Sequence, residues 1–162
     1  MLAGTRLMRR AAAAAIVLAF AGSTTMVVAQ AQNPMVGRWS LNVAKSTASG
    51  SLPRKRDLTI TQKDADITVV VDEVMADGTA NKWTFTTKGD GKPVPATGWA
   101  VLDTATSTLS GHKGKTTYTK AGKVVMESNT EVSADGKTLM ITGSRPGPDG
   151  KSMTFSSHYD RH

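Results

Sequence analysis

The 162-residue sequence contains no cysteine, only three histidines, and few aromatic residues, which make up 5% of the chain. Without cysteine there is no disulfide, no thiol nucleophile, no cysteine zinc site and no lipid-modified cysteine at a processed N-terminus. Packing and strand pairing must therefore supply the stability. A helical apolar period is also lacking after the first 31 residues.

Those first 31 residues have the three parts of an export signal. Arg6, Arg9 and Arg10 form a basic start, and the apolar run AAAAAIVLAFA at 11–21 is too short to span a bilayer. The small-x-small triplet AQA then ends at Ala31. We predict a signal peptide over residues 1–31, with cleavage after Ala31. The alternatives are an N-terminal membrane anchor and, for the route, twin-arginine export.

The predicted cleavage leaves one domain, residues 32–162, in the periplasm or outside the cell. Cleavage also changes the charge, because three of the 20 basic residues and none of the 13 acidic ones precede it, so the net charge falls from +7 to +4. This surplus is ordinary solubilising charge and predicts no nucleic-acid partner. We also expect no stable membrane insertion after cleavage. The basic run RKR at 54–56 is interpreted as a solvated loop, with an acidic partner or a lipid headgroup as the alternative.

Strand-sized segments fill the chain from residue 57 onward, marked by alternating or β-branched residues. They are residues 58–62, 67–71, 79–87, 99–103, 106–110, 115–120, 123–133, 137–145 and 151–161. Hairpin turns are predicted at Asp77-Gly78, Asp90-Gly91, Asp135-Gly136 and Asp149-Gly150, and near Gly122. The pattern predicts an all-β fold, an antiparallel up-and-down meander of about 8–10 strands closed into a barrel that has no free edges.

The turn at Asp135-Gly136 also predicts a register. A two-residue loop there pairs Val132 with Leu139 and Thr130 with Ile141. One face of the hairpin then collects apolar side chains, as a half-buried sheet requires. These side chains are Val124, Met126, Val132, Leu139 and Ile141.

No residues form a convincing catalytic or metal site. His158 and Asp160 share a strand face, but no serine is marked as a nucleophile by an elbow motif. Glu127 and Glu131 would lie about 13 Å apart along one strand, wider than either glycosidase arrangement. We therefore predict no catalytic residue, no metal site, no cofactor and no enzymatic activity.

The segment GRWSLNVAKS at 37–46 resembles the opening of small exported bacterial proteins described as lipocalin-like, of uncharacterised function, with a calycin-type β-barrel. The likeness continues through VSADGKTL at 132–139 and ends near Tyr159-Asp160-Arg161. The resemblance implies a barrel in which Trp39, two residues after Gly37, plugs one end. It also implies an arginine cover over that tryptophan. Arg161 is the candidate for this cover and Arg145 is the alternative.

A barrel of this size is wide enough for side chains or for one small ligand. Adaptable and aromatic side chains suit an apolar ligand. The candidate lining residues are Trp83, Phe85, Trp99, Tyr118, Met126, Met140 and Phe155. One hypothesis is an exported barrel that binds a small apolar or amphipathic molecule. The other is a periplasmic interaction module, an inhibitor or an envelope-assembly factor, with a filled barrel and a contact surface at 43–56. No protein partner is identified.

Overall fold

The computed structural model describes residues 33–147 and 149–162, and the predicted signal peptide lies outside the described residues. Within these ranges, none of the helices has the length and apolar character needed to cross a membrane. The strands are β1 (Gly37–Leu41), β2 (Thr47–Ala48), β3 (Lys55–Lys63), β4 (Asp66–Val74), β5 (Ala80–Thr87), β6 (Asp90–Thr97), β7 (Thr104–Ser110), β8 (Lys113–Lys120), β9 (Lys123–Val132), β10 (Thr138–Pro146) and β11 (Ser152–Arg161). A 3-10 turn, η1 (Val43–Lys45), precedes β2.

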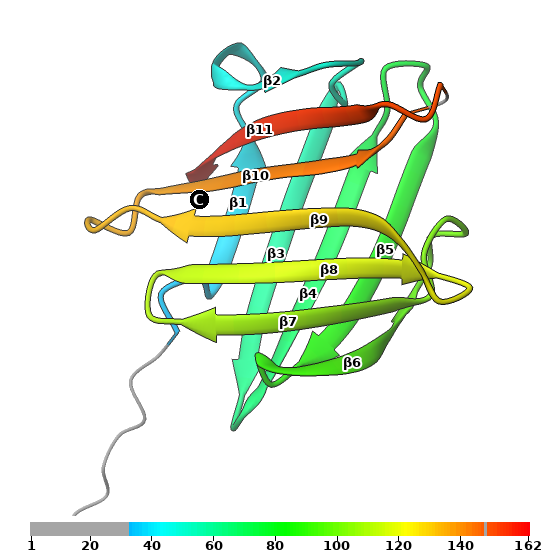
Figure 1. The fold of residues 1–162 in the computed structure, drawn as a ribbon. Coiled ribbons are helices and arrows are strands. Elements are labelled where there is room, and N and C mark those ends of the chain that lie inside the picture. The colour runs from blue at the N-terminus through cyan, green and yellow to red at the C-terminus, as the bar shows by residue number, and fades with distance from the viewer. Residues whose placement is uncertain (1–32, 148) are drawn as a thin grey trace, which may run out of the picture. The chain divides into compact units, whose positions relative to one another are not determined.

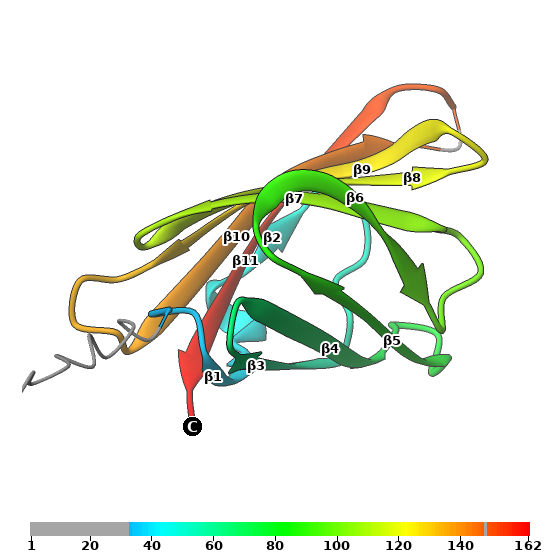
Figure 2. The same ribbon diagram turned by 90° about the horizontal axis from the view of Figure 1, so that it is seen from below.

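Ten of these strands form a closed antiparallel barrel. Each strand from β3 to β10 pairs with the next, β1 pairs with β3, and β1 also pairs with β11, which closes the sheet. The small β2 adds to β11 outside this ring. Figures 1 and 2 show the two curved halves, with β1, β3, β4 and β5 on one side and β7 to β10 on the other. The predicted all-β barrel fold is confirmed.

The hairpin around Asp135-Gly136 has the predicted register. Val132 pairs with Leu139 and Thr130 pairs with Ile141. The expected inward position of Val124 is wrong, because the register of β8 and β9 shifts between Tyr118 and Thr119. The shift reverses the alternation beyond that point, so that the side chain of Val124 is 52% exposed.

The sequence prediction also misplaced one strand. Residues 99–103 form a connection instead of a strand, and β6 runs through the segment where a hairpin at Asp90-Gly91 was predicted. Proline is disfavoured inside sheets because it lacks an N–H group. Pro93 and Pro95 are tolerated here because β5 pairs with β6 only through Thr97 and Ala96.

The antiparallel register gives the barrel two distinct ends. One end, the plug end, holds the N-terminal segment from residue 33, the β7–β8 turn and the β9–β10 turn. The other end, the open end, holds the connections 49–54, 75–79, 98–103 and 147–151, in the last of which only residue 148 is not described. The buried apolar core runs between them, from Met35 and Trp39 to Trp83 and Leu102.

Candidate functional site

Trp39 lies at the plug end with none of its surface exposed. Its indole Nε1 donates to the backbone oxygen of Met35 at 2.9 Å. The guanidinium of Arg161 lies 4.0 Å from the centre of the Trp39 ring, a cation–π distance. Arg161 also donates to the backbone oxygens of Pro34 and Val36, each at 2.7 Å, and to that of Gly136. This arginine therefore ties the N-terminal segment and the β9–β10 turn to the tryptophan.

Gly37 makes this arrangement possible. Its φ of +150° is one that L side chains rarely adopt, and a Cβ there would collide with the Arg161 guanidinium. We expect Gly37→Ala to destabilise the protein by about 1 to 3 kcal/mol, because it combines backbone strain with displacement of Arg161. Urea denaturation measures the loss. Gly78→Ala is a useful control, because that glycine also has positive φ but no atom lies within 4 Å of its built Cβ.

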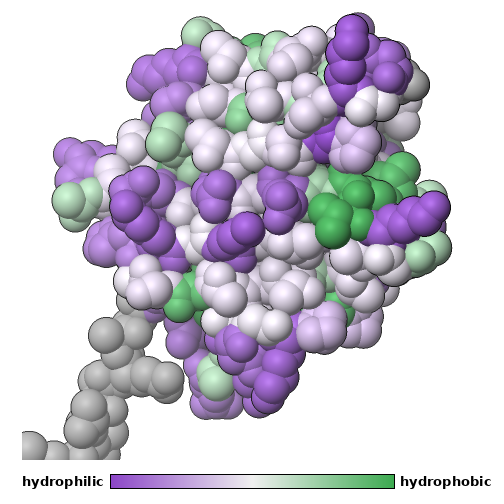
Figure 3. All heavy atoms as spheres, in the orientation of Figure 1, coloured by the Kyte–Doolittle hydropathy of each residue, from purple (hydrophilic) through white to green (hydrophobic). Residues whose placement is uncertain are grey.

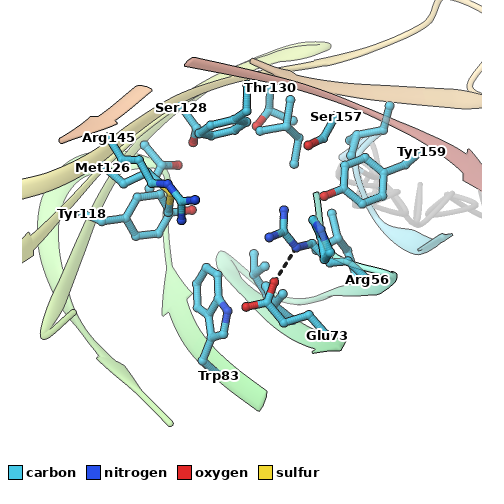
Figure 4. A pocket seen from close by; sticks show the side chains of 18 of the residues that line it. Arg56, Glu73, Trp83, Tyr118, Met126, Ser128, Thr130, Arg145, Ser157 and Tyr159 are labelled. Atoms are coloured by element: carbon cyan, nitrogen blue, oxygen red, sulfur yellow. Dashed lines mark hydrogen bonds and ion pairs between the residues drawn. The ribbon is translucent and has the colours of Figure 1, made fainter. Parts of the chain in front are cut away.

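The interior of the barrel is not packed solid. It encloses a cavity of about 140 Å³, counted as the space that the centre of a water molecule can reach. A single water needs about 10 to 15 Å³ on this measure, so the space suits a larger occupant. Residues 50–53, Met75 and Arg145 line it toward the open end, and Met35 lines it toward the plug end. Figure 4 shows how the labelled side chains surround this space.

Six of the seven residues proposed to line a ligand site do line the cavity. They are Trp83, Phe85, Trp99, Tyr118, Met126 and Phe155. Met140 does not, and this part of the prediction is wrong. Its neighbours Leu139 and Ile141 face inward, so the strand alternation turns Met140 to the outer surface, where it is 36% exposed. Arg145, the alternative cover for Trp39, lines the cavity at its open end and belongs to the site.

Aromatic rings form one wall of the cavity. The ring of Trp83 stacks on those of Phe85 and Trp99, with centroids 6.1 and 5.7 Å apart, and meets Tyr118 edge-on at 5.7 Å. Val69 and Val71 of β4 extend the apolar surface. This wall can bury an apolar ligand body.

Next to these rings, on the adjacent strands β3 and β4, lies a buried ion pair that the sequence prediction missed. Arg56 of β3 and Glu73 of β4 are directly paired in the sheet, and the Arg56 Nε lies 2.6 Å from a carboxylate oxygen of Glu73. The Glu73 side chain is 1% exposed and that of Arg56 is 22% exposed. The interpretation of residues 54–56 as a solvated loop is thus wrong for Arg56. Strand alternation was the available signal, because it places Arg56 on the face of the buried Leu58.

Hydroxyl groups add a second polar region. Ser107 and Thr116 share a hydrogen bond of 3.0 Å inside the barrel, and Ser128, Ser157 and Tyr159 also line the cavity. Burial raises the pKa of Tyr159, although the nearby Arg56 guanidinium opposes the shift. Tyrosine hydroxyls that stay protonated remain hydrogen-bond donors at neutral pH.

Tyr118 gives a prediction about pH. Burial raises its pKa to about 12, while hydrogen bonds with Ser128 and Thr116 act in the opposite direction. The folded state favours the neutral hydroxyl, so this stabilisation is complete below pH 10 and is lost as the pH rises from 10 to 12. We expect the free energy of unfolding to fall by about 3 kcal/mol over that window on this account. Urea denaturation at each pH should show a smaller fall for Tyr118→Phe.

Hydrophobic side chains also lie around the open end. Val101 is 49% exposed in the connection between β6 and β7, and Val124 is exposed where β9 begins. Figure 3 shows a compact hydrophobic patch at the edge of the molecule where Figure 1 has the end of β8 and the start of β9.

Asp160 and His112, two of the polar residues outside the cavity, have local partners. Asp160 accepts a hydrogen bond from Asn42 and lies 3.9 Å from Lys45, while His112 contacts the backbone oxygen of Val132. Across residues 33–147 and 149–162, no three His, Asp or Glu side chains are grouped to hold a metal ion.

Comparison with known proteins gave likenesses of structure alone. No protein-family model and no curated protein matches the sequence. Zebrafish ileal bile acid-binding protein in complex with cholic acid is similar over 80% of this chain and 100% of that chain, at 14% identity and a TM-score of 0.47. EF1p2_mFAP2b bound to DFHBI is similar over 80% and 94%, at 12% identity and a TM-score of 0.43. The siderocalin Ex-FABP is similar over 80% and 75%, at 14% identity and a TM-score of 0.35.

Proposed function

We propose that this protein binds one small, mainly apolar molecule inside the barrel and is exported to the periplasm or beyond. The observation that carries the proposal is the cavity of about 140 Å³, which is lined by aromatic rings and by a small set of polar side chains. A filled barrel, which the interaction-module hypothesis assumes, does not leave such a space. The export half of the proposal rests on the leader-like residues 1–31.

This mixed apolar and polar lining suits an amphipathic ligand. Burial of apolar surface against Trp83, Phe85 and Val71 provides the driving force. The polar groups of the lining are few and fixed, as in sites where they orient a ligand. The plug end is closed by Trp39 and Arg161, so we expect a ligand to enter through the open end.

Ser128 and Asn129 of β9 offer a matched test, because Ser128 is buried and lines the cavity whereas Asn129 is exposed. We expect N-phenyl-1-naphthylamine, an uncharged fluorescent probe, to bind the wild-type protein and the Asn129→Phe variant equally. Ser128→Phe places a ring inside the cavity and should weaken binding at least tenfold. Fluorescence titration measures both affinities, and circular dichroism checks the fold.

Equal affinity in all three proteins would place the probe outside the cavity. Failure of the wild-type protein to bind it at all would count directly against the proposed function.

A further inference from the structure

Two buried polar atoms in the cavity wall have no hydrogen-bond partner among residues 33–147 and 149–162. They are the second carboxylate oxygen of Glu73, Oε1, and the indole nitrogen of Trp83, Nε1. The two residues are 1% and 6% exposed. A buried donor or acceptor without a partner carries the full cost of its lost hydration, so native proteins rarely leave one unexplained.

The two atoms belong to one region of the wall. Glu73 and Trp83 lie on the adjacent strands β4 and β5, and Trp83 pairs with Val71, two residues before Glu73 on the same face. Both side chains line the cavity. In Figure 4 the nitrogen-bearing edge of Trp83 is turned toward the Glu73 carboxylate.

The geometry points to a ligand subsite at Glu73 and Trp83 that takes the hydroxyl group of an uncharged, otherwise apolar molecule. This inference rests on the proposed function and names the chemical class of its ligand. A hydroxyl is both donor and acceptor, so one group can donate to Oε1 of Glu73 and accept from the N–H of Trp83.

Other ligand groups match the two atoms less well. A carboxylate accepts from Trp83 but has no proton to give Glu73, and it places a negative charge beside another. An ammonium donates to Glu73, yet it leaves the Trp83 N–H without an acceptor. The charge of Arg56 offers neither group an advantage, because Glu73 already neutralises it at 2.6 Å.

The test compares three probes with one alkyl chain: 1-octanol, methyl octyl ether and octanoate. The ether oxygen accepts a hydrogen bond but cannot donate one, so the ether tests whether the ligand must donate to Glu73. We expect 1-octanol to bind the wild-type protein about tenfold more tightly than either analogue, in line with the cost of one unpaired buried group. Affinities come from displacement of N-phenyl-1-naphthylamine.

Two variants separate the contributions. Glu73→Gln removes the negative charge and leaves Arg56 without its counter-ion, so the preference should shift by at least tenfold toward octanoate. Trp83→Phe keeps an aromatic ring but removes the N–H. It should weaken the binding of 1-octanol and of methyl octyl ether by the same factor. Asn129→Phe, on the exposed face of β9, is the control and should leave the order of the probes unchanged.

The indole N–H signal of Trp83 in a 15N-labelled sample gives a second readout. It should move downfield when 1-octanol binds. Equal affinity for the three probes would overturn the inference but leave the proposed function standing. That result is expected if a water molecule, and not the ligand, forms hydrogen bonds with the two atoms. Tighter binding of octanoate would place the ligand head at Arg145 and overturn it too. If 1-octanol does not bind, the inference is overturned as well. In that case the proposed function stands if N-phenyl-1-naphthylamine binds and fails if it does not.

Discussion

Replacement of Trp39 by alanine is expected to lower the free energy of unfolding by about 3 to 5 kcal/mol, the range for deleting a large buried aromatic side chain. The ring has no exposed surface, and its removal opens a void at the plug end. It also removes the platform on which the Arg161 guanidinium lies. Urea denaturation followed by far-ultraviolet circular dichroism measures the change.

A double-mutant cycle with Arg161→Met separates the two effects. We expect a coupling energy of about 1 to 2 kcal/mol between Trp39 and Arg161, because the guanidinium is partly desolvated over the ring. Trp99→Ala is the control, since Trp99 is only half-buried and should cost less. A loss below about 1 kcal/mol for Trp39→Ala would show that the ring does not hold the plug end together.

Removal of the positive charge inside the barrel should be nearly as costly. Arg56→Met leaves the carboxylate of Glu73, 1% exposed, without its partner. We expect a loss of about 3 to 5 kcal/mol, as for other buried pairs broken on one side. The double variant Arg56→Met/Glu73→Leu removes both charges at similar volume and should recover most of that loss.

The exposed pair Lys82 and Asp72, 3.5 Å apart on neighbouring strands, provides the control. Lys82→Met should cost less than about 1 kcal/mol, because solvent screens that pair. Guanidinium chloride denaturation of the variants tests the contrast. Equal losses for Arg56→Met and Lys82→Met would mean that water screens the pair inside the barrel as well.

The regular parts of this fold were readable from the sequence because local signals agreed with one another. The turn at Asp135-Gly136 and the flanking alternation both required Val132 to face Leu139, and they do. The opening around Trp39 predicted a plugged barrel through resemblance, and the structure places Arg161 over that ring. The candidate lining residues were chosen because adaptable and aromatic side chains suit an apolar ligand, and six of the seven line the cavity.

The errors arose where non-local pairing overrides local pattern. β6 was not predicted because it contains Pro93 and Pro95. These prolines are tolerated only because β5 does not pair with that part of β6, and the sequence does not show this. The register shift near Tyr118 turns the side chain of Val124 to the outer face of β9. The alternation of residues in β9 does not reveal this shift. Arg56 was missed for another reason: a basic run suggests solvent, and the buried carboxylate that neutralises it lies on the next strand.

The most direct test of a ligand-binding barrel is native mass spectrometry. The protein is incubated with an extract of the cells that produce it, separated from free small molecules, and measured before and after denaturation. The cavity predicts a non-covalent adduct of one defined mass on the wild-type protein, which disappears on denaturation and is absent from Ser128→Phe. The mass of the bare chain in both spectra of the wild-type protein would contradict the proposal.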